Sequence, residues 1–193
     1  MVVNKMGIQH NHYADPTNKV GCDQWNDEHK IVNMLGYELV EEKILPAGTT
    51  SCVFDGLNGD VDEEYLIVCD ILIAGTSDRT MFVIPDTGVG SEFVGYSHAA
   101  GGQVSVNGVG FPLVPPSGGR MYQYVELRIF AKSGKFRHSY GFRNGWATDG
   151  SWLMGEQIHG LWKNSTSLIG ALTVGISIGG SFSGLIKLYK KIP

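Results

Sequence analysis

The amino-acid sequence predicts an all-β protein: an antiparallel β-sandwich or jelly roll preceded by an irregular N-terminal arm. Glycine accounts for 27 of the 193 residues, which is about twice the usual share and predicts many turns. From Tyr37 onward, short runs of β-branched and aromatic residues alternate with turn sequences such as Pro46-Ala47-Gly48. No long amphipathic helical pattern interrupts this alternation.

The first 35 residues are predicted to form an arm, separate from a sandwich domain at 36–193. This segment is polar, and no apolar periodicity lasts in it apart from a short helical stretch around Trp25–Leu35. A segment of this composition buries little surface on its own, so we expect it to become ordered against a partner or a neighbouring subunit. The residues that we expect to contribute to assembly are His10, His12, Trp25 and His29.

Nine strands are predicted after the arm, because runs of strand-forming residues alternate with turn sequences rich in glycine, proline, asparagine or serine. They are Tyr37–Leu45, Thr49–Phe54, Tyr65–Ala74, Thr80–Ile84, Gln103–Val106, Tyr122–Ala131, Phe136–Phe142, Ala171–Ile178 and Leu185–Tyr189. Tyr65–Ala74 is apolar at nearly every position, as in a central strand covered on both faces. Asp70 within it would need an edge position or a hydrogen-bonded partner.

Two further features of these elements are predicted. Asn58-Gly59 is a hairpin-type turn pair in the acidic segment Asp55–Glu64. Leu185–Tyr189 places Ile186 and Leu188 on one face, and the lysines that follow it would protect an edge strand from unwanted pairing.

Charge and hydropathy argue against several classes of protein. The net charge is −4 and no basic run occurs, so nucleic acid is not an expected partner. The charge-free run Asn164–Ile186 alternates with period two, which favours a core strand over a membrane span. The start of the chain, Met1–Tyr13, lacks the apolar core of a signal peptide. Cys22, Cys52 and Cys69 lack zinc-like spacing and suit a reducing cytoplasm, where Cys52 and Cys69 would be small buried hydrophobic residues.

Four motifs occur in a fixed order from residue 54 onward. They are Phe54-Asp-Gly-Leu-Asn-Gly-Asp-Val-Asp-Glu-Glu-Tyr65, Ala131-Lys-Ser-Gly-Lys-Phe-Arg137, Leu161-Trp-Lys-Asn-Ser-Thr-Ser-Leu-Ile169 and Ser181-Phe-Ser-Gly-Leu-Ile-Lys-Leu-Tyr-Lys190. Together they resemble a group of small β-sandwich proteins of tailed phages, found among tail-fibre and other virion proteins. Leu185 departs from this group, in which serine is usual. The resemblance covers about residues 37–193.

The resemblance implies a non-enzymatic virion protein, assembled in the host cytoplasm and exposed as a tail fibre, baseplate piece or head decoration. The expected partners are copies of the chain itself, as a homotrimer, and other virion proteins through the arm. A second interpretation is an adhesin that binds a host glycan, and a third is an unrecognised polysaccharide hydrolase.

A glycine-rich loop predicted at Arg143–Gly155 carries or adjoins the residues that would suit a glycan site. Exposed aromatic faces beside polar groups are the features that such a site uses. The candidates are Trp146, Trp152, Trp162, Asn144 and Asp149. The alternative is that these tryptophans fill the ends of the sandwich or a subunit interface, because tryptophan is mostly buried.

Metal and catalytic motifs are weak. His10-x-His12 supplies two imidazoles per chain, or six in a trimer, but two solvated histidines are the simpler interpretation. The acidic segment Asp55–Glu64 does not fit the spacing of an EF-hand. The sequence has no nucleophile elbow, P-loop or zinc-protease motif. We therefore expect no cofactor, no bound metal and no enzymatic activity.

Overall fold

A computed structural model describes residues 36–75, 79–86, 93–99, 102–107, 110–117, 121–150, 153–177 and 179–192 of the protein. The chain divides into two units at the junction between Leu35 and Gly36. The predicted arm lies outside the described residues, and so do Cys22 and Trp152. The arm residues concerned are His10, His12, Trp25 and His29.

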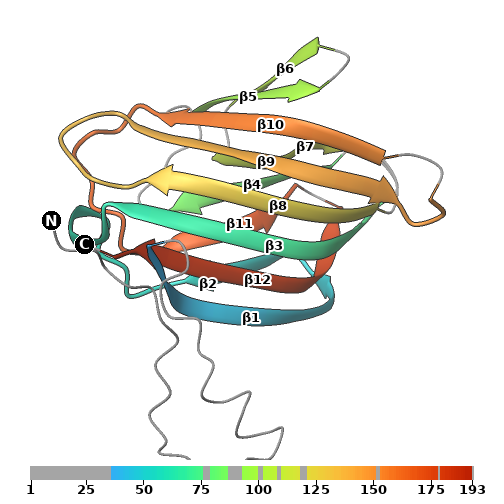
Figure 1. Ribbon diagram of the computed structural model, residues 1–193, viewed down its shortest axis with the longest axis horizontal. Coiled ribbons are helices and arrows are strands. Elements are labelled where there is room, and N and C mark those ends of the chain that lie inside the picture. The colour runs from blue at the N-terminus through green and yellow to red at the C-terminus, as the bar shows by residue number, and fades with distance from the viewer. Residues whose placement is uncertain are drawn as a thin grey trace, which may run out of the picture. The chain divides into compact units, whose positions relative to one another are not determined.

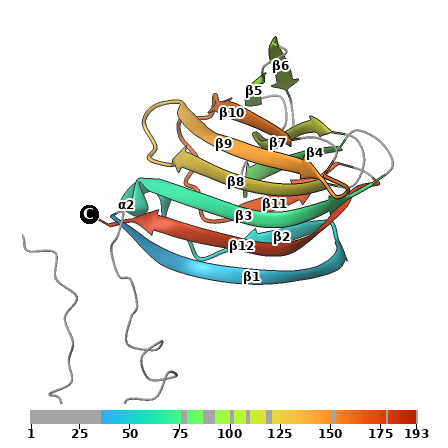
Figure 2. The same cartoon turned by 45° about the vertical axis from the view of Figure 1, so that its right-hand side comes forward.

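The described part of the second unit forms two antiparallel sheets packed as a sandwich, with the small sheet behind the large one in Figures 1 and 2. The large sheet has eight strands in the order β1-β12-β3-β8-β9-β10-β5-β6, and the small sheet has four in the order β2-β11-β4-β7. The strands of the large sheet are β1 (Tyr37–Thr49), β12 (Ser181–Lys191), β3 (Glu64–Ala74), β8 (Met121–Phe130), β9 (Arg137–Ala147), β10 (Leu153–Trp162), β5 (Phe93–Ala99) and β6 (Gly102–Asn107). Those of the small sheet are β2 (Ser51–Phe54), β11 (Leu172–Ile176), β4 (Arg79–Pro85) and β7 (Phe111–Ser117). The predicted fold class is confirmed.

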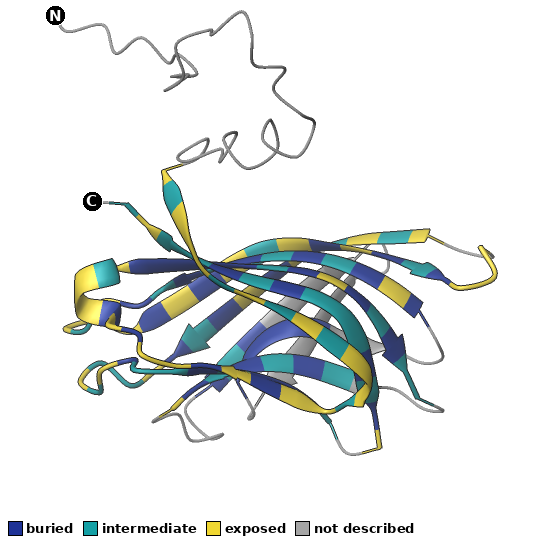
Figure 3. Ribbon diagram, turned by 90° about the horizontal axis from the view of Figure 1, so that it is seen from below, coloured by how far each residue is buried: buried dark blue, intermediate teal, exposed yellow. Residues whose placement is uncertain are grey.

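Side chains alternate along the strands between a core and an outer surface, which gives the banded colouring of Figure 3. On β8, Met121, Val125 and Ile129 are buried, whereas Tyr122 is exposed. Period-two alternation of this kind is the expected pattern for a sheet with one covered face. We call the face of the large sheet that points away from the small sheet the outer face.

All nine predicted strands are present, and three further strands were missed. β7 begins Phe111-Pro112 and contains two more prolines, which argue against a strand at the sequence level. It lies at the edge of the small sheet and pairs only with β4, where proline is tolerated because one side needs no partner. β5 and β10 carry glycines that weaken their strand pattern.

Two predictions about strand position were wrong. β12 is not an edge strand, because it pairs with both β1 and β3. β3 is central, as predicted, but only its inward face is covered, and Asp70 is exposed on the outer face. Water therefore solvates Asp70, which needs neither an edge position nor a buried partner. Ile186 and Leu188 both face the core, as the alternation predicted.

Two predicted turns also differ from the structure. Asn58-Gly59 does not form a hairpin turn: Asn58 caps a one-turn helix, α2 (Gly59–Asp62), and its side-chain oxygen accepts a hydrogen bond from the backbone nitrogen of Val61. Local turn chemistry fits both arrangements, because asparagine is favoured in turns and at helix N-caps. The predicted loop Arg143–Gly155 is mostly strand, since β9 continues to Ala147 and β10 begins at Leu153.

Residues 172–176 of the charge-free run form β11, a strand of the small sheet, in agreement with the prediction. Within the described residues, no helix has the length and apolar character needed to cross a membrane.

Candidate functional site

The first three motifs meet at one end of the sandwich, at the left of Figure 1. We call this end, formed by residues 55–64, 131–137 and 162–170, the motif end. Backbone hydrogen bonds connect the three segments. Gly59 N donates to Ile169 O at 3.1 Å, Ala131 N donates to Glu63 O at 2.8 Å, and Gly134 N donates to Ser165 O at 2.8 Å.

Arg137 is the central side chain of the motif end and is only 1% exposed. Its Nε donates to Ala131 O at 2.9 Å and its Nη1 donates to Asn164 O at 2.9 Å, while Nη2 donates to Ser167 O. The guanidinium also lies over the ring of Trp162, at 4.9 Å from the centroid. The planar guanidinium group can make this fan of bonds because its N–H groups point in fixed directions.

The acidic residues of the motif end bind protein groups and do not converge on one point. Asp60 Oδ1 accepts from Ser133 N at 2.7 Å, and this hydrogen bond lowers the pKa of Asp60. Asp62 Oδ2 accepts from the Tyr65 hydroxyl at 2.6 Å, and Glu63 pairs with Lys132. Among the described residues, no group of three or more His, Cys, Asp or Glu side chains is arranged to hold a metal ion. The acidic side chains of the motif end thus bind its own backbone and side chains.

Trp162, one of the predicted glycan-binding residues, belongs to this interior. It is fully buried and stacks on Phe93, with ring centroids 5.6 Å apart and planes inclined by 5°. A buried indole offers no face to a glycan at the surface. The sequence suggested a surface position because Trp162 follows a predicted glycine-rich loop, but its side chain points inward from β10, as that of Ile158 does.

Trp146 and Asn144 lie together on the outer face, on β9. Trp146 is half-buried and stacks on Tyr122 of β8, with ring centroids 5.7 Å apart and planes inclined by 25°. Asn144 is exposed, and Asp149 is exposed in the turn that follows β9. Of the predicted glycan-binding residues within the described part of the chain, these three remain at the surface.

The outer face of β8 and β9 is richer in aromatic side chains than the predicted loop. Tyr122, Tyr140 and Phe142 are 40%, 41% and 43% exposed. Phe130 stacks on His138, with ring centroids 4.2 Å apart. Every second residue of Tyr122–Phe130 and His138–Trp146 contributes to this face, so alternation within two strands was the signal that sequence reasoning overlooked. The exposed aromatic side chains make this face a candidate contact surface.

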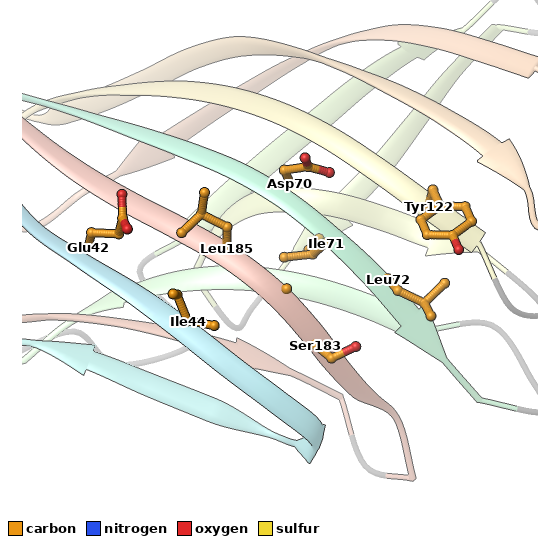
Figure 4. Close-up of a pocket in the computed structure, with 9 residues that line it drawn as sticks. Glu42, Ile44, Asp70, Ile71, Leu72, Tyr122, Ser183 and Leu185 are labelled. Atoms are coloured by element: carbon orange, nitrogen blue, oxygen red, sulfur yellow. The ribbon is translucent and has the colours of Figure 1, made fainter. Parts of the chain in front are cut away.

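A shallow hollow of about 540 Å³ lies beside Tyr122 on the outer face of β1, β12, β3 and β8. Figure 4 shows its lining, with Asp70 and Tyr122 rising beside an apolar floor. The residues that line it are Glu42, Ile44, Asp70, Ile71, Leu72, Tyr122, Ser183, Gly184 and Leu185. The hollow was not predicted, because its residues come from four strands that are distant in the sequence.

Gly184 lines the hollow and allows β12 to approach β3 closely. Its φ is +123°, and a Cβ at this position would lie 2.4 Å from the backbone oxygen of Asp70. Any larger residue would push β12 away from β3, so only glycine permits this close approach. Ser183, the next small residue, lies at the same end of the floor.

The described residues thus offer two distinct features: a structural motif end and an outer face with aromatic side chains and a hollow. The motifs that resemble tailed-phage proteins lie mainly in the first feature. No protein-family model, no curated protein and no solved structure matches the chain.

Proposed function

We propose that the chain is a non-enzymatic structural protein of a tailed-phage virion, exposed on the particle. The sandwich faces outward and residues 1–35 attach it to other virion proteins. The observation that supports this proposal is the junction of the first three motifs at the motif end. Asp60 and Ser133, for example, are 73 residues apart in the sequence and share a hydrogen bond.

Residues of the motifs lie at tightly packed or hydrogen-bonded positions, which argues against a chance resemblance to the phage proteins. Gly59 lies where a Cβ would be 3.1 Å from the Cβ atoms of both Ala131 and Ile169. Arg137 is buried and bonded to three carbonyl groups. Residues shared by distant proteins are expected at such packing and hydrogen-bonding positions, because substitutions there are costly. The motifs therefore support a common fold with the phage proteins that they resemble.

The start of the sandwich supports the direction of attachment. Ile192 N donates to Gly36 O at 2.8 Å, and the Tyr37 hydroxyl donates to Glu64 beside α2. The first and last described residues are thus adjacent at the motif end. The described chain therefore begins at the motif end, and the opposite end, with the turn after β9, is available to face outward.

The test is whether purified particles contain the chain. Peptide mass spectrometry and gold-labelled antibodies should find it at a fixed copy number on the particle surface. Light scattering after size exclusion should give a trimer for the full chain and a smaller species for residues 36–193. A chain that is abundant in the lysate of infected cells but absent from purified particles would contradict the proposal.

A further inference from the structure

The hollow on the outer face is shallow and open to solvent. Its volume, about 540 Å³, falls within the range of pockets that hold a small molecule. The floor is apolar, being formed by Leu72, Leu185 and the side of Ile44, which is 81% exposed. An apolar floor open to water favours a ligand with one apolar face and one hydrated face.

Tyr122 forms a fixed aromatic wall at one side of this floor. Its ring is 40% exposed and is held from behind by the stack on Trp146. A ring that is already positioned loses little conformational entropy when a ligand packs against it. The C–H face of a sugar ring is a suitable partner for such a wall.

Asp70 supplies the polar group. Its neighbours across the sheet are Leu185 on β12 and Tyr124 on β8, and the Tyr124 hydroxyl donates instead to Glu126 at 2.6 Å. Within the part of the chain that the structure describes, no hydrogen bond or ion pair engages the Asp70 carboxylate. This carboxylate is therefore ready to accept hydrogen bonds from a ligand.

Glu42, the other acidic residue of the hollow, differs from Asp70. Lys187 Nζ lies 2.9 Å from its carboxylate, so the pair is close to neutral. The hollow thus combines one carboxylate that can accept hydrogen bonds with apolar and aromatic surfaces. An apolar protein partner would bury Asp70 without a hydrogen bond, which is unfavourable, whereas ring hydroxyls would satisfy it.

We propose that this hollow binds a neutral sugar ring, which packs one C–H face against Tyr122 and donates hydroxyl hydrogen bonds to Asp70. The site lies on the strand face and not in the turn after β9. It adds a binding activity to the structural role proposed above and does not depend on that role.

The test uses the full chain labelled with ¹⁵N and three neutral probes: methyl β-glucoside, methyl β-galactoside and methyl N-acetyl-β-glucosaminide. Because the hollow is open, we expect saturable shifts with a Kd of roughly 1–10 mM for at least one probe. The shifting signals should be those of Asp70 and Leu72, and the indole of Trp146. The same spectra show whether each variant is folded.

Two substitutions test the contacts, and a third is the matched control. Asp70→Ala and Tyr122→Ala should each weaken binding about tenfold, because each removes one of the two main contacts. Tyr140→Ala removes an equally exposed aromatic ring from the same face, outside the hollow. It should leave the affinity unchanged.

The proposal is overturned if none of the three glycosides gives saturable shifts, or if Asp70→Ala and Tyr122→Ala bind them as well as the parent chain does. Binding of tetramethylammonium in place of the glycosides, lost in Asp70→Ala, would assign a cation site and overturn it as well. These outcomes leave the particle measurements unaffected, so failure of the sugar site can be told apart from failure of the virion proposal.

Discussion

The guanidinium of Arg137 lies 4.9 Å from the ring centroid of Trp162, and both side chains are buried. The two residues belong to different motifs, one at the start of β9 and the other at the end of β10. The indole covers one face of the guanidinium, and three carbonyl groups accept hydrogen bonds at its edge. The charge of Arg137 is thus stabilised by dipoles and an aromatic face, which compensates for its removal from water.

Arg137→Ala should destabilise the sandwich by about 3–5 kcal/mol, because it leaves buried carbonyl groups without donors and removes packing from Trp162. The free energy of unfolding of Arg137→Lys should lie between those of the parent and the alanine variant, since lysine keeps the charge but lacks the planar guanidinium group. Urea unfolding, followed by far-ultraviolet circular dichroism, gives both free energies of unfolding.

Arg128→Lys is the control for this series. Arg128 lies over the rings of Tyr37 and Tyr140, at 5.5 and 5.8 Å from their centroids, but its side chain is 41% exposed. Its replacement by lysine should cost less than about 1 kcal/mol, because solvent already hydrates the charge. Equal losses of stability in Arg128→Lys and Arg137→Lys would contradict the role assigned to Arg137.

A second buried arginine, Arg143, has a different partner. Its Nε donates to Glu156 Oε2 at 2.8 Å, and the two side chains are 1% and 7% exposed. Glu156→Gln should destabilise the protein by about 3 kcal/mol, because it removes the buried ion pair between Glu156 and Arg143. The double variant Arg143→Met with Glu156→Leu should recover much of this loss in urea unfolding, since no buried charge remains. A double variant less stable than Glu156→Gln would refute this account.

The strands were largely predictable because local alternation records which face of each strand is buried. β8 shows this well, since Tyr122 to Phe130 alternate in the sequence as they do in the fold. β7 was missed because Pro112 is tolerated in a strand only at the edge of a sheet. The sequence of a single strand does not show whether that strand lies at an edge, since strand order depends on the whole fold. The place of β12 between β1 and β3 was missed for the same reason.

The candidate sites were less predictable. Trp146 and Trp162 are 16 residues apart and look alike in the sequence, yet one faces outward and the other lies in the core. The hollow depends on which strands are neighbours, because Asp70, Tyr122 and Ser183 come together only through the order β12-β3-β8. A sequence pattern fixes the face on which a residue lies but not the residues that will lie beside it.

Gly141 is the site where a small substitution should have a large effect. A Cβ at this position would lie 1.9 Å from the backbone oxygen of Glu126 on the neighbouring strand. Gly141→Ala should therefore separate β8 from β9 locally and cost more than about 3 kcal/mol in urea unfolding. Gly155→Ala is the control, because its Cβ would meet only Asn144 Oδ1 at 3.2 Å, and it should change stability by less than about 1 kcal/mol.

Stability should decline at alkaline pH, because buried thiols and phenols hold their protons more tightly in the folded chain. Burial raises the pKa of Cys52 to about 11 and raises that of Cys69 as well, and the hydrogen bond to Glu126 raises the pKa of Tyr124 to about 12. In the unfolded chain a thiol ionises at about pH 8.5. The contribution of a buried, protonated thiol to folding stability is therefore complete below that pH and is lost as the pH rises toward 11. The urea midpoint should therefore fall between about pH 8 and pH 10.5. The Cys69→Ala variant should unfold at a lower urea concentration than the parent chain at about pH 8, but its midpoint should fall less between about pH 8 and pH 10.5. An equal fall would show that Cys69 does not contribute to the pH dependence.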